Sequence, residues 1–79
     1  MGATSALLAR QAIGLARDVV AIELLVMTEA MEHQRPLQSG KGVETIVRHI
    51  RTVVPALTND RAPSPDIARI AELIASGTL

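Results

Sequence analysis

The chain has 79 residues, with eight basic and eight acidic side chains and no Cys, Phe, Trp or Tyr. This length allows a single domain with a small core, and the zero net charge argues against nucleic acid as a partner. The lack of cysteine excludes disulfides, a thiol nucleophile and cysteine-ligated metal sites, and it is compatible with a cytoplasmic location.

The first predicted element is one long helix over about residues 4–33. A helix at the surface of a domain leaves about half of its circumference polar, but this one is apolar on almost every side. The rest of a chain this short cannot surround it. We therefore expect the 4–33 helix to self-associate or to pack against upstream polypeptide. Its apolar positions are Leu7, Leu8, Ile13, Leu15, Val19, Val20, Ile22, Leu24, Leu25, Val26 and Met27.

The ends of this helix follow from local signals. Thr4 or Ser5 is expected to cap its start, and Pro36 ends it. Gly14 in so crowded a helix predicts the close approach of a neighbouring helix. No heptad register is evident. Charged residues interrupt the apolar sequence from Arg10 onward, so neither a membrane span nor a signal peptide is expected.

A second helix is predicted over about residues 43–54. Ser39, in the preceding turn, is available as its cap, and Pro55 closes it. The helical spacing of five aliphatic residues predicts that they form one buried stripe along this helix. These are Val43, Ile46, Val47, Ile50 and Val54.

A third helix is predicted over about residues 65–75. Ser64-Pro65-Asp66 combines an N-cap, a proline at the first helical position and an acid in the first turn, and Gly77 suits a C-terminal cap. Its buried face consists of Ile67, Ile70, Ala71 and Ile74. The predicted fold is all-α, with residues 1–79 forming one helical segment of a larger bundle.

Several charged residues are candidates for a site. Glu29 and His33 lie one helical turn apart, next to Glu32, and could share a metal ion. His49 is the only other histidine. Without cysteine or a repeated Glu-x-x-His pattern, solvated charges at a helix end are the preferred interpretation, and no metal site is predicted.

The remaining charges have structural interpretations. Glu23 interrupts an apolar surface, so it either pairs with an arginine from another helix, which we favour, or marks one wetted strip. Arg35 is expected to bind the terminal carbonyls of the long helix rather than a ligand. Arg48 and Arg51 are expected on the exposed side of the second helix, with Glu44 paired to Arg48.

The order of several motifs resembles a known family. Ala21-Ile22-Glu23-Leu24-Leu25 lies in the long helix, and Arg35-Pro36-Leu37, Asp60-Arg61 and Pro65-Asp66-Ile67 follow. This set is similar to the C-terminal segment of the histidine and aromatic amino-acid ammonia-lyases, most closely the bacterial histidine ammonia-lyases. Met1-Gly2 also looks like the Met-Gly that follows a Gln-Glu-Asp-His-like segment in that family.

The resemblance implies a homotetrameric enzyme built on a bundle of long helices. Members eliminate ammonia from histidine or an aromatic amino acid with a methylidene-imidazolone formed from an internal Ala-Ser-Gly. Their catalytic groups, a tyrosine among them, lie upstream of the position that matches Met1. We therefore expect no catalytic, cofactor-binding or metal-binding residue in this chain, a structural and oligomerisation role, and no activity of the chain alone.

One tripeptide matches the cofactor precursor by composition. Ala75-Ser76-Gly77 is an Ala-Ser-Gly, but only Thr78 and Leu79 follow it. Cyclisation of the backbone requires a buried, strained loop, which a fraying end does not provide. We expect this tripeptide to be a helix end.

Two other functions are compatible with the pattern. The chain could be an independent small helical protein that self-associates through its first helix. A DNA-binding helix-turn-helix is less well supported, because the second helix lacks a basic face that would contact bases.

Overall fold

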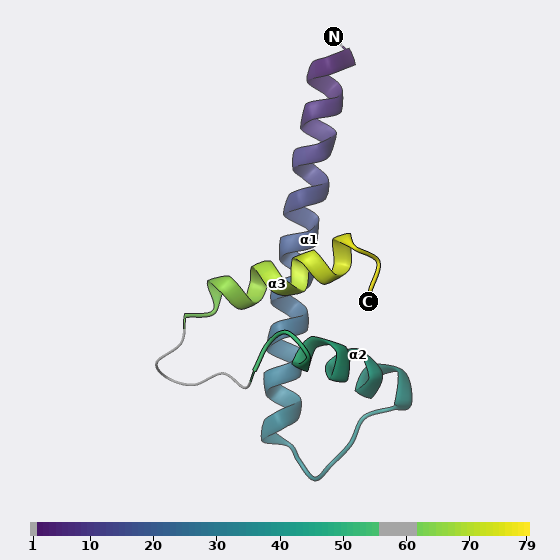
Figure 1. Ribbon diagram of the computed structural model, residues 1–79, viewed down its shortest axis with the longest axis vertical. Coiled ribbons are helices and arrows are strands. Elements are labelled where there is room, and N and C mark those ends of the chain that lie inside the picture. The colour runs from purple at the N-terminus through teal and green to yellow at the C-terminus, as the bar shows by residue number, and fades with distance from the viewer. Residues whose placement is uncertain (1, 56–61) are drawn as a thin grey trace.

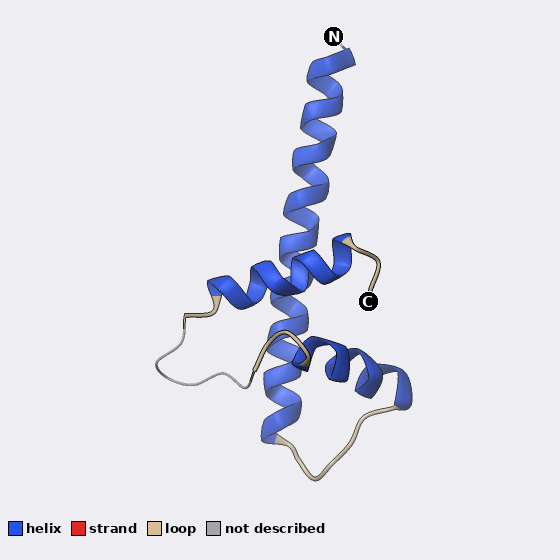
Figure 2. Cartoon of the chain, in the orientation of Figure 1, coloured by secondary structure: helices blue, strands red, loops and turns tan. Residues whose placement is uncertain are grey.

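The computed structural model describes residues 2–55 and 62–79. It contains α1 (Gly2–His33), α2 (Lys41–Arg51) and α3 (Ser64–Ala75), and no strand is present in these two ranges (Figure 2). The prediction of an all-α fold with one long and two shorter helices is confirmed. The Asp60-Arg61 motif lies outside the described residues.

The three helices form an elongated molecule around α1. In Figure 1, α3 crosses α1 near its middle and α2 lies by its C-terminal half, while the N-terminal half of α1 projects beyond both. The radius of gyration is 14.8 Å and the extents are 54 × 31 × 16 Å. A compact chain of this length would have a radius of gyration of about 12 Å. The shape therefore leaves much of α1 without intramolecular contacts.

The hydrophobic core lies where the three helices meet. Each contribution from α1 comes from its C-terminal half, where α3 packs across it. Thr28, also fully buried there, donates its hydroxyl to the carbonyl of Leu24 at 2.8 Å, so its polar group is satisfied. The central buried residues are Ala21, Leu25, Ile50, Val54 and Ile70.

The predicted apolar stripes form the contact faces of the short helices. In α2 and the turn after it, Val47, Ile50 and Val54 are buried, whereas Ile46 lies at the exposed edge. Ile70 is the buried centre of α3. The other three members of its predicted stripe are partly buried, namely Ile67, Ala71 and Ile74.

The end of α2 differs slightly from the prediction. Its last helical residue is Arg51, and the N–H groups of Val53 and Val54 both donate to the carbonyl of Ile50. These bonds form a tight turn over residues 52–54 immediately before Pro55. The turn keeps Val54 on the buried side although the regular helix has ended.

The predicted N-terminal caps of α1 and α2 are wrong. α1 starts at Gly2, so Thr4 and Ser5 lie within the helix, where flanking alanines continue it. The N-cap of α2 is Gly40 and makes no side-chain capping bond. Ser39 contributes its backbone N–H to a carboxylate instead, as described below.

The start of α3 is only partly as predicted. Pro65 lies in the first turn, but Ser64 is already helical and the N-cap is Pro63, without a side-chain capping bond. Asp66 is fully buried and accepts a hydrogen bond from Arg69 at 3.2 Å. The acid in the first turn thus pairs with a residue one turn further along α3, at the helix end where a negative charge is favourable.

The predicted glycine cap of α3 is confirmed. Gly77 has a φ of 77°, and its N–H donates to the carbonyl of Ile74, while Thr78 N–H donates to that of Leu73. This pair of bonds is a Schellman motif, which satisfies carbonyls that a helix end leaves unpaired.

Replacing Gly77 by Ala is expected to lower the free energy of unfolding by about 1–2 kcal/mol, because an L side chain is strained at positive φ. Urea unfolding followed by circular dichroism measures the change. Gly42→Ala is the control, since Gly42 lies within α2 at negative φ and an added Cβ would meet no atom within 4 Å. Gly42→Ala should be neutral or stabilising, and equal losses in both variants would contradict the role of the Schellman motif.

No described part of the chain approaches Gly14 closely. A Cβ built there would meet no atom within 4 Å, although Gly14 borders a hollow that it shares with Ala68, Ala71 and Ala75 of α3. The predicted close helix contact at Gly14 is therefore not made within the chain. Among the described residues, none of the helices combines the length and hydrophobicity needed to cross a bilayer.

Candidate functional site

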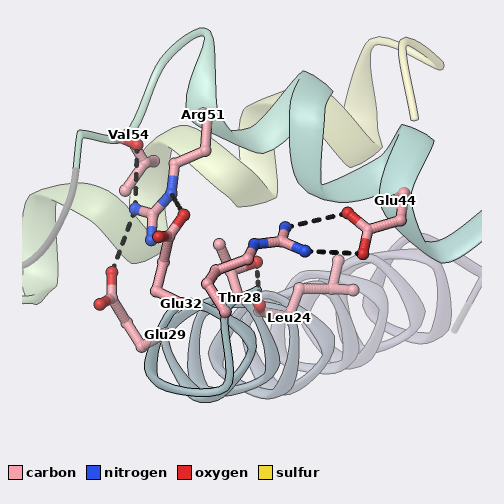
Figure 3. Close-up of polar contacts among 8 residues, drawn as sticks. Leu24, Thr28, Glu29, Glu32, Glu44, Arg51 and Val54 are labelled. Carbon is pink, nitrogen blue, oxygen red and sulfur yellow. Dashed lines mark hydrogen bonds and ion pairs between the residues drawn. The ribbon is translucent and has the colours of Figure 1, made fainter. Parts of the chain in front are cut away.

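A cluster of ion pairs joins the end of α2 to α1 (Figure 3). Arg51 Nη1 lies 3.1 Å from Glu29 Oε1, and Arg51 Nε lies 3.6 Å from Glu32 Oε1. Arg51 Nη1 also donates to the carbonyl of Val54 at 3.3 Å. The side chains of Arg51 and Glu29 are only 19% and 18% exposed. A single guanidinium thus fixes both the end of α2 and the following turn against α1.

The Arg51 cluster positions the helices more than it stabilises them. Arg51 Nε and Nη2 are buried and have no hydrogen-bond partner within residues 2–55 and 62–79. A buried donor without a hydrogen bond costs about 1–3 kcal/mol, which offsets much of the attraction in a desolvated ion pair. The main effect of the cluster is therefore to fix the position of α2 relative to α1.

A second ion pair holds the loop between α1 and α2. Arg35 donates from Nη1 and Nη2 to the two carboxylate oxygens of Glu44, both at 2.9 Å. Glu44 also accepts the backbone N–H of Ser39 at 2.8 Å, and Arg35 reaches the carbonyl of Leu37 at 3.3 Å. Parallel bonds of this kind are the strongest form of an arginine–carboxylate contact. They fold the loop back onto the first turn of α2.

The electrostatics of Glu44 follow from these bonds. Hydrogen bonding to Arg35, and then to the N–H of Ser39, lowers the pKa of Glu44 from 4.5 to about 2. The same contact with Glu44 raises the pKa of Arg35. Both groups are therefore charged at any physiological pH.

Glu44 makes stability depend on pH in acid. Because its pKa is lower in the folded chain than in the unfolded chain, its contribution is complete above about pH 4.5 and is lost as pH falls toward 2. Glu44→Gln should remove this part of the pH dependence, measured as the urea midpoint at steps between pH 5 and pH 2. Lys41→Gln serves as the comparison variant. A wild-type slope that survives in Glu44→Gln would contradict the assignment.

Three sequence predictions about arginines are wrong. Arg35 binds Glu44 rather than the helix carbonyls, because a charged bidentate acceptor outcompetes a single neutral one. The hydrogen bonds of Glu44 go to Arg35 instead of Arg48, which contributes only a weaker electrostatic attraction to this carboxylate. Of the two arginines expected on the exposed side of α2, Arg48 is exposed but Arg51 is mostly buried. The missed signal is spacing, since Arg51 follows Val47 by four residues and so extends the buried stripe.

The acidic turn at the end of α1 also differs from its predicted state. Glu29 and Glu32 bind Arg51 and are not merely solvated helix-end charges. His33 and His49 are both exposed. Within the two described ranges, no three side chains of the His, Asp and Glu types converge into a metal-binding group.

Two further candidates lie apart from this cluster. Glu23 is exposed, and the pairing with an arginine from another helix that we favoured is not made among residues 2–55 and 62–79. Ser76 donates to the carbonyl of Leu73 at 3.1 Å and lies 2.8 Å from the hydroxyl of Thr78. Ala75-Ser76-Gly77 thus forms the end of α3, as predicted.

The arrangement as a whole suits an anchor between helices better than a reaction centre. A hollow of about 260 Å³ lies between the two ion-pair groups, and Arg35, Arg48 and Arg51 line it with Glu32 and Glu44. Both of these carboxylates already face a guanidinium, so neither is set up as a general base.

Comparison with curated proteins finds similarity to histidine ammonia-lyases. Over all 79 residues, the chain is 40% identical to the histidine ammonia-lyase of Stigmatella aurantiaca and 39% identical to that of Myxococcus xanthus (strain DK1622). It is 43% identical to that of Sorangium cellulosum (strain So ce56). The chain is similar to these histidine ammonia-lyases over its whole length. It corresponds to the C-terminal segment of these enzymes, which confirms the resemblance seen in the sequence.

The alignment with the histidine ammonia-lyases covers all of this chain but only a small part of each relative. The chain spans only 16%, 16% and 15% of the lengths of the Stigmatella, Myxococcus and Sorangium enzymes. No family model matches it, and no solved structure matches it. Both ion-pair groups lie within the 79 residues that align with these lyases.

Proposed function

We propose that this chain is an architectural segment of a homotetrameric, cytoplasmic histidine ammonia-lyase, in which α1 lies in the central helical bundle and α2 and α3 cover its outside. The observation that carries the proposal is the apolar surface of the N-terminal half of α1. Leu7, Leu8 and Ile13 are 53–61% exposed and point in different directions around the helix. A soluble monomer rarely exposes so many large apolar side chains on one helix.

Burial in an assembly would give this surface a large stabilising effect. Enclosing an aliphatic side chain of this size contributes about 1.5–3 kcal/mol. The described core reaches no further toward the N-terminus of α1 than Ala21. Neighbouring helices of the enzyme would therefore supply the packing that the 79 residues do not.

The parent reaction would be the elimination of ammonia from histidine, which yields urocanate. The electrophile of the family, a methylidene-imidazolone, does not fit the residues of this chain. Ser76 is exposed at a capped helix end and already bonds to Leu73 and Thr78, whereas cyclisation requires an enclosed loop. We assign no catalytic step to this chain and expect it to be inactive alone.

A chimera tests the proposal. The C-terminal segment of the Stigmatella aurantiaca enzyme would be replaced by these 79 residues, and urocanate formation followed by its ultraviolet absorbance. Activity comparable with the parent enzyme is expected, because the replacement should restore the bundle. Arg48→Ala in the chimera is a matched surface control and should leave activity unchanged.

The same experiment identifies the alternative. An inactive chimera that fails to assemble, together with a stable symmetric oligomer of the 79-residue chain, would favour an independent self-associating helical protein. Urocanate production by the 79-residue chain alone would contradict the expected inactivity.

A further inference from the structure

Glu23 lies on the side of α1 opposite the core. Ala21, Leu25 and Thr28 are the buried residues of α1 closest to it in the sequence. At about 100° per residue, Glu23 is about 140–160° around the helix from each of these three. Its exposed side chain therefore projects from the surface of α1 that α2 and α3 leave uncovered.

The surface around Glu23 is apolar. Residues three and four positions away are the neighbours of a side chain on a helix. For Glu23 these are Val19, Val20, Val26 and Met27. The three valines are 45–63% exposed. None of the four can neutralise a carboxylate, so α1 offers Glu23 no partner of its own.

The other charges in residues 2–30 of α1 lie on a different side of the helix. They are Arg10, Arg17, Asp18 and Glu29. Each is about 120–140° around the helix from Glu23. Within residues 2–30, Glu23 is therefore the one charge at the centre of the outer apolar face.

We propose that Glu23 is a docking contact, which receives a guanidinium from a helix of the polypeptide that precedes this segment in the relatives. The inference rests on the proposed function, in which neighbouring helices of the enzyme cover α1. A carboxylate covered together with this apolar surface loses its hydration, and a cation with good hydrogen bonds must compensate. Arginine fits best, because its planar guanidinium can bond both carboxylate oxygens.

The rest of the enzyme is a better source of this cation than a second copy of the chain. The chain aligns with 15–16% of the lengths of its relatives, at their C-terminal end. Most of such an enzyme is therefore upstream polypeptide. Two copies docked through the outer faces of α1 would each present Glu23 and turn Arg10 and Arg17 away from the contact.

Two substitutions in the chimera test the contact. Glu23→Gln keeps the size of the side chain and removes its charge, whereas Glu23→Leu extends the apolar surface. Either one would leave a buried guanidinium without its carboxylate. The half-life of urocanate-forming activity at a fixed elevated temperature should therefore fall by about tenfold or more in both variants.

The sign of the Glu23→Leu effect decides between a paired and a hydrated carboxylate. A hydrated Glu23 would make Glu23→Leu lengthen the half-life, because the variant adds apolar contact. That result, or an unchanged half-life in Glu23→Gln, would overturn the proposal. Glu72→Gln is the matched control, since Glu72 is also exposed but lies on α3. An equal loss in Glu72→Gln would also overturn it.

The 79-residue chain tests the source of the cation. Glu23→Gln should not change its urea unfolding at any protein concentration, because none of residues 2–55 and 62–79 pairs with Glu23. A loss of stability that grows with protein concentration would show that a second copy supplies the cation and would overturn the assignment to upstream polypeptide.

The docking contact and the proposed function fail in distinguishable ways. An inactive wild-type chimera would overturn the proposed function and the docking contact with it. An active wild-type chimera in which Glu23→Leu is as stable as the parent would overturn the docking contact alone.

Discussion

Replacing Ile50 by Ala is expected to lower the free energy of unfolding by about 2–5 kcal/mol. Ile50 is 0% exposed and belongs to the core cluster in which all three helices take part. Its truncation would open a cavity in the core cluster where residues of α1, α2 and α3 meet. A domain this small has a total stability of only about 5 kcal/mol, so the variant should retain no more than about 3 kcal/mol.

Ile46→Ala provides the comparison for this variant. Ile46 lies on the same helix and is 36% exposed, so its truncation should cost about 1 kcal/mol or less. Urea unfolding at one fixed protein concentration gives both values, because any self-association would otherwise change the apparent stability. Equal losses at the two positions would show that the three-helix junction is not the centre of the fold.

The helices were predictable because their ends carry local signals. Pro36 and Pro55 stop the first two helices, and Pro65 and Gly77 bracket the third. These residues act through their own backbone conformations, which do not depend on the tertiary structure. The caps from Ser39 and Thr4 failed for the opposite reason. A hydroxyl is only one of several groups that can satisfy a helix terminus.

The ion-pair cluster was not predictable in the same way. Arg35 and Glu44 are nine residues apart, and Arg51 bonds to acids on a different helix. Such contacts depend on how the loop folds and on which side of α2 faces α1, and helical spacing alone does not specify either. Only the position of Arg51 next to the apolar stripe carried a signal.

The apolar circumference of α1 illustrates both the use and the limit of sequence patterns. Its composition correctly predicts a helix that the rest of the chain cannot cover. Because apolar residues occur on every side, the sequence does not separate the face of α1 that packs against α2 and α3 from the faces that stay exposed. The structure makes that separation, because Ala21 and Leu25 are buried in the core whereas Leu15, Val19 and Val26 are exposed.

Replacing Arg51 by Leu is expected to lower the free energy of unfolding by about 2–3 kcal/mol. The loss arises because Glu29, which is mostly buried, would be left without this cation, while the carbonyl of Val54 would lose a donor. The figure lies at the lower end for a broken buried pair, because Glu32 is 43% exposed and can be hydrated. Arg48→Leu on the same helix should change stability by less than about 0.5 kcal/mol.

A double-mutant cycle separates the ion pair from simple packing at Arg51. Glu29→Leu should partly restore the stability of Arg51→Leu, because it removes a desolvated carboxylate and leaves two apolar groups in contact. Strictly additive losses in Arg51→Leu and Glu29→Leu would mean that the two residues act independently. The aliphatic stem of Arg51, rather than its guanidinium, would then be the part that holds α2 against α1.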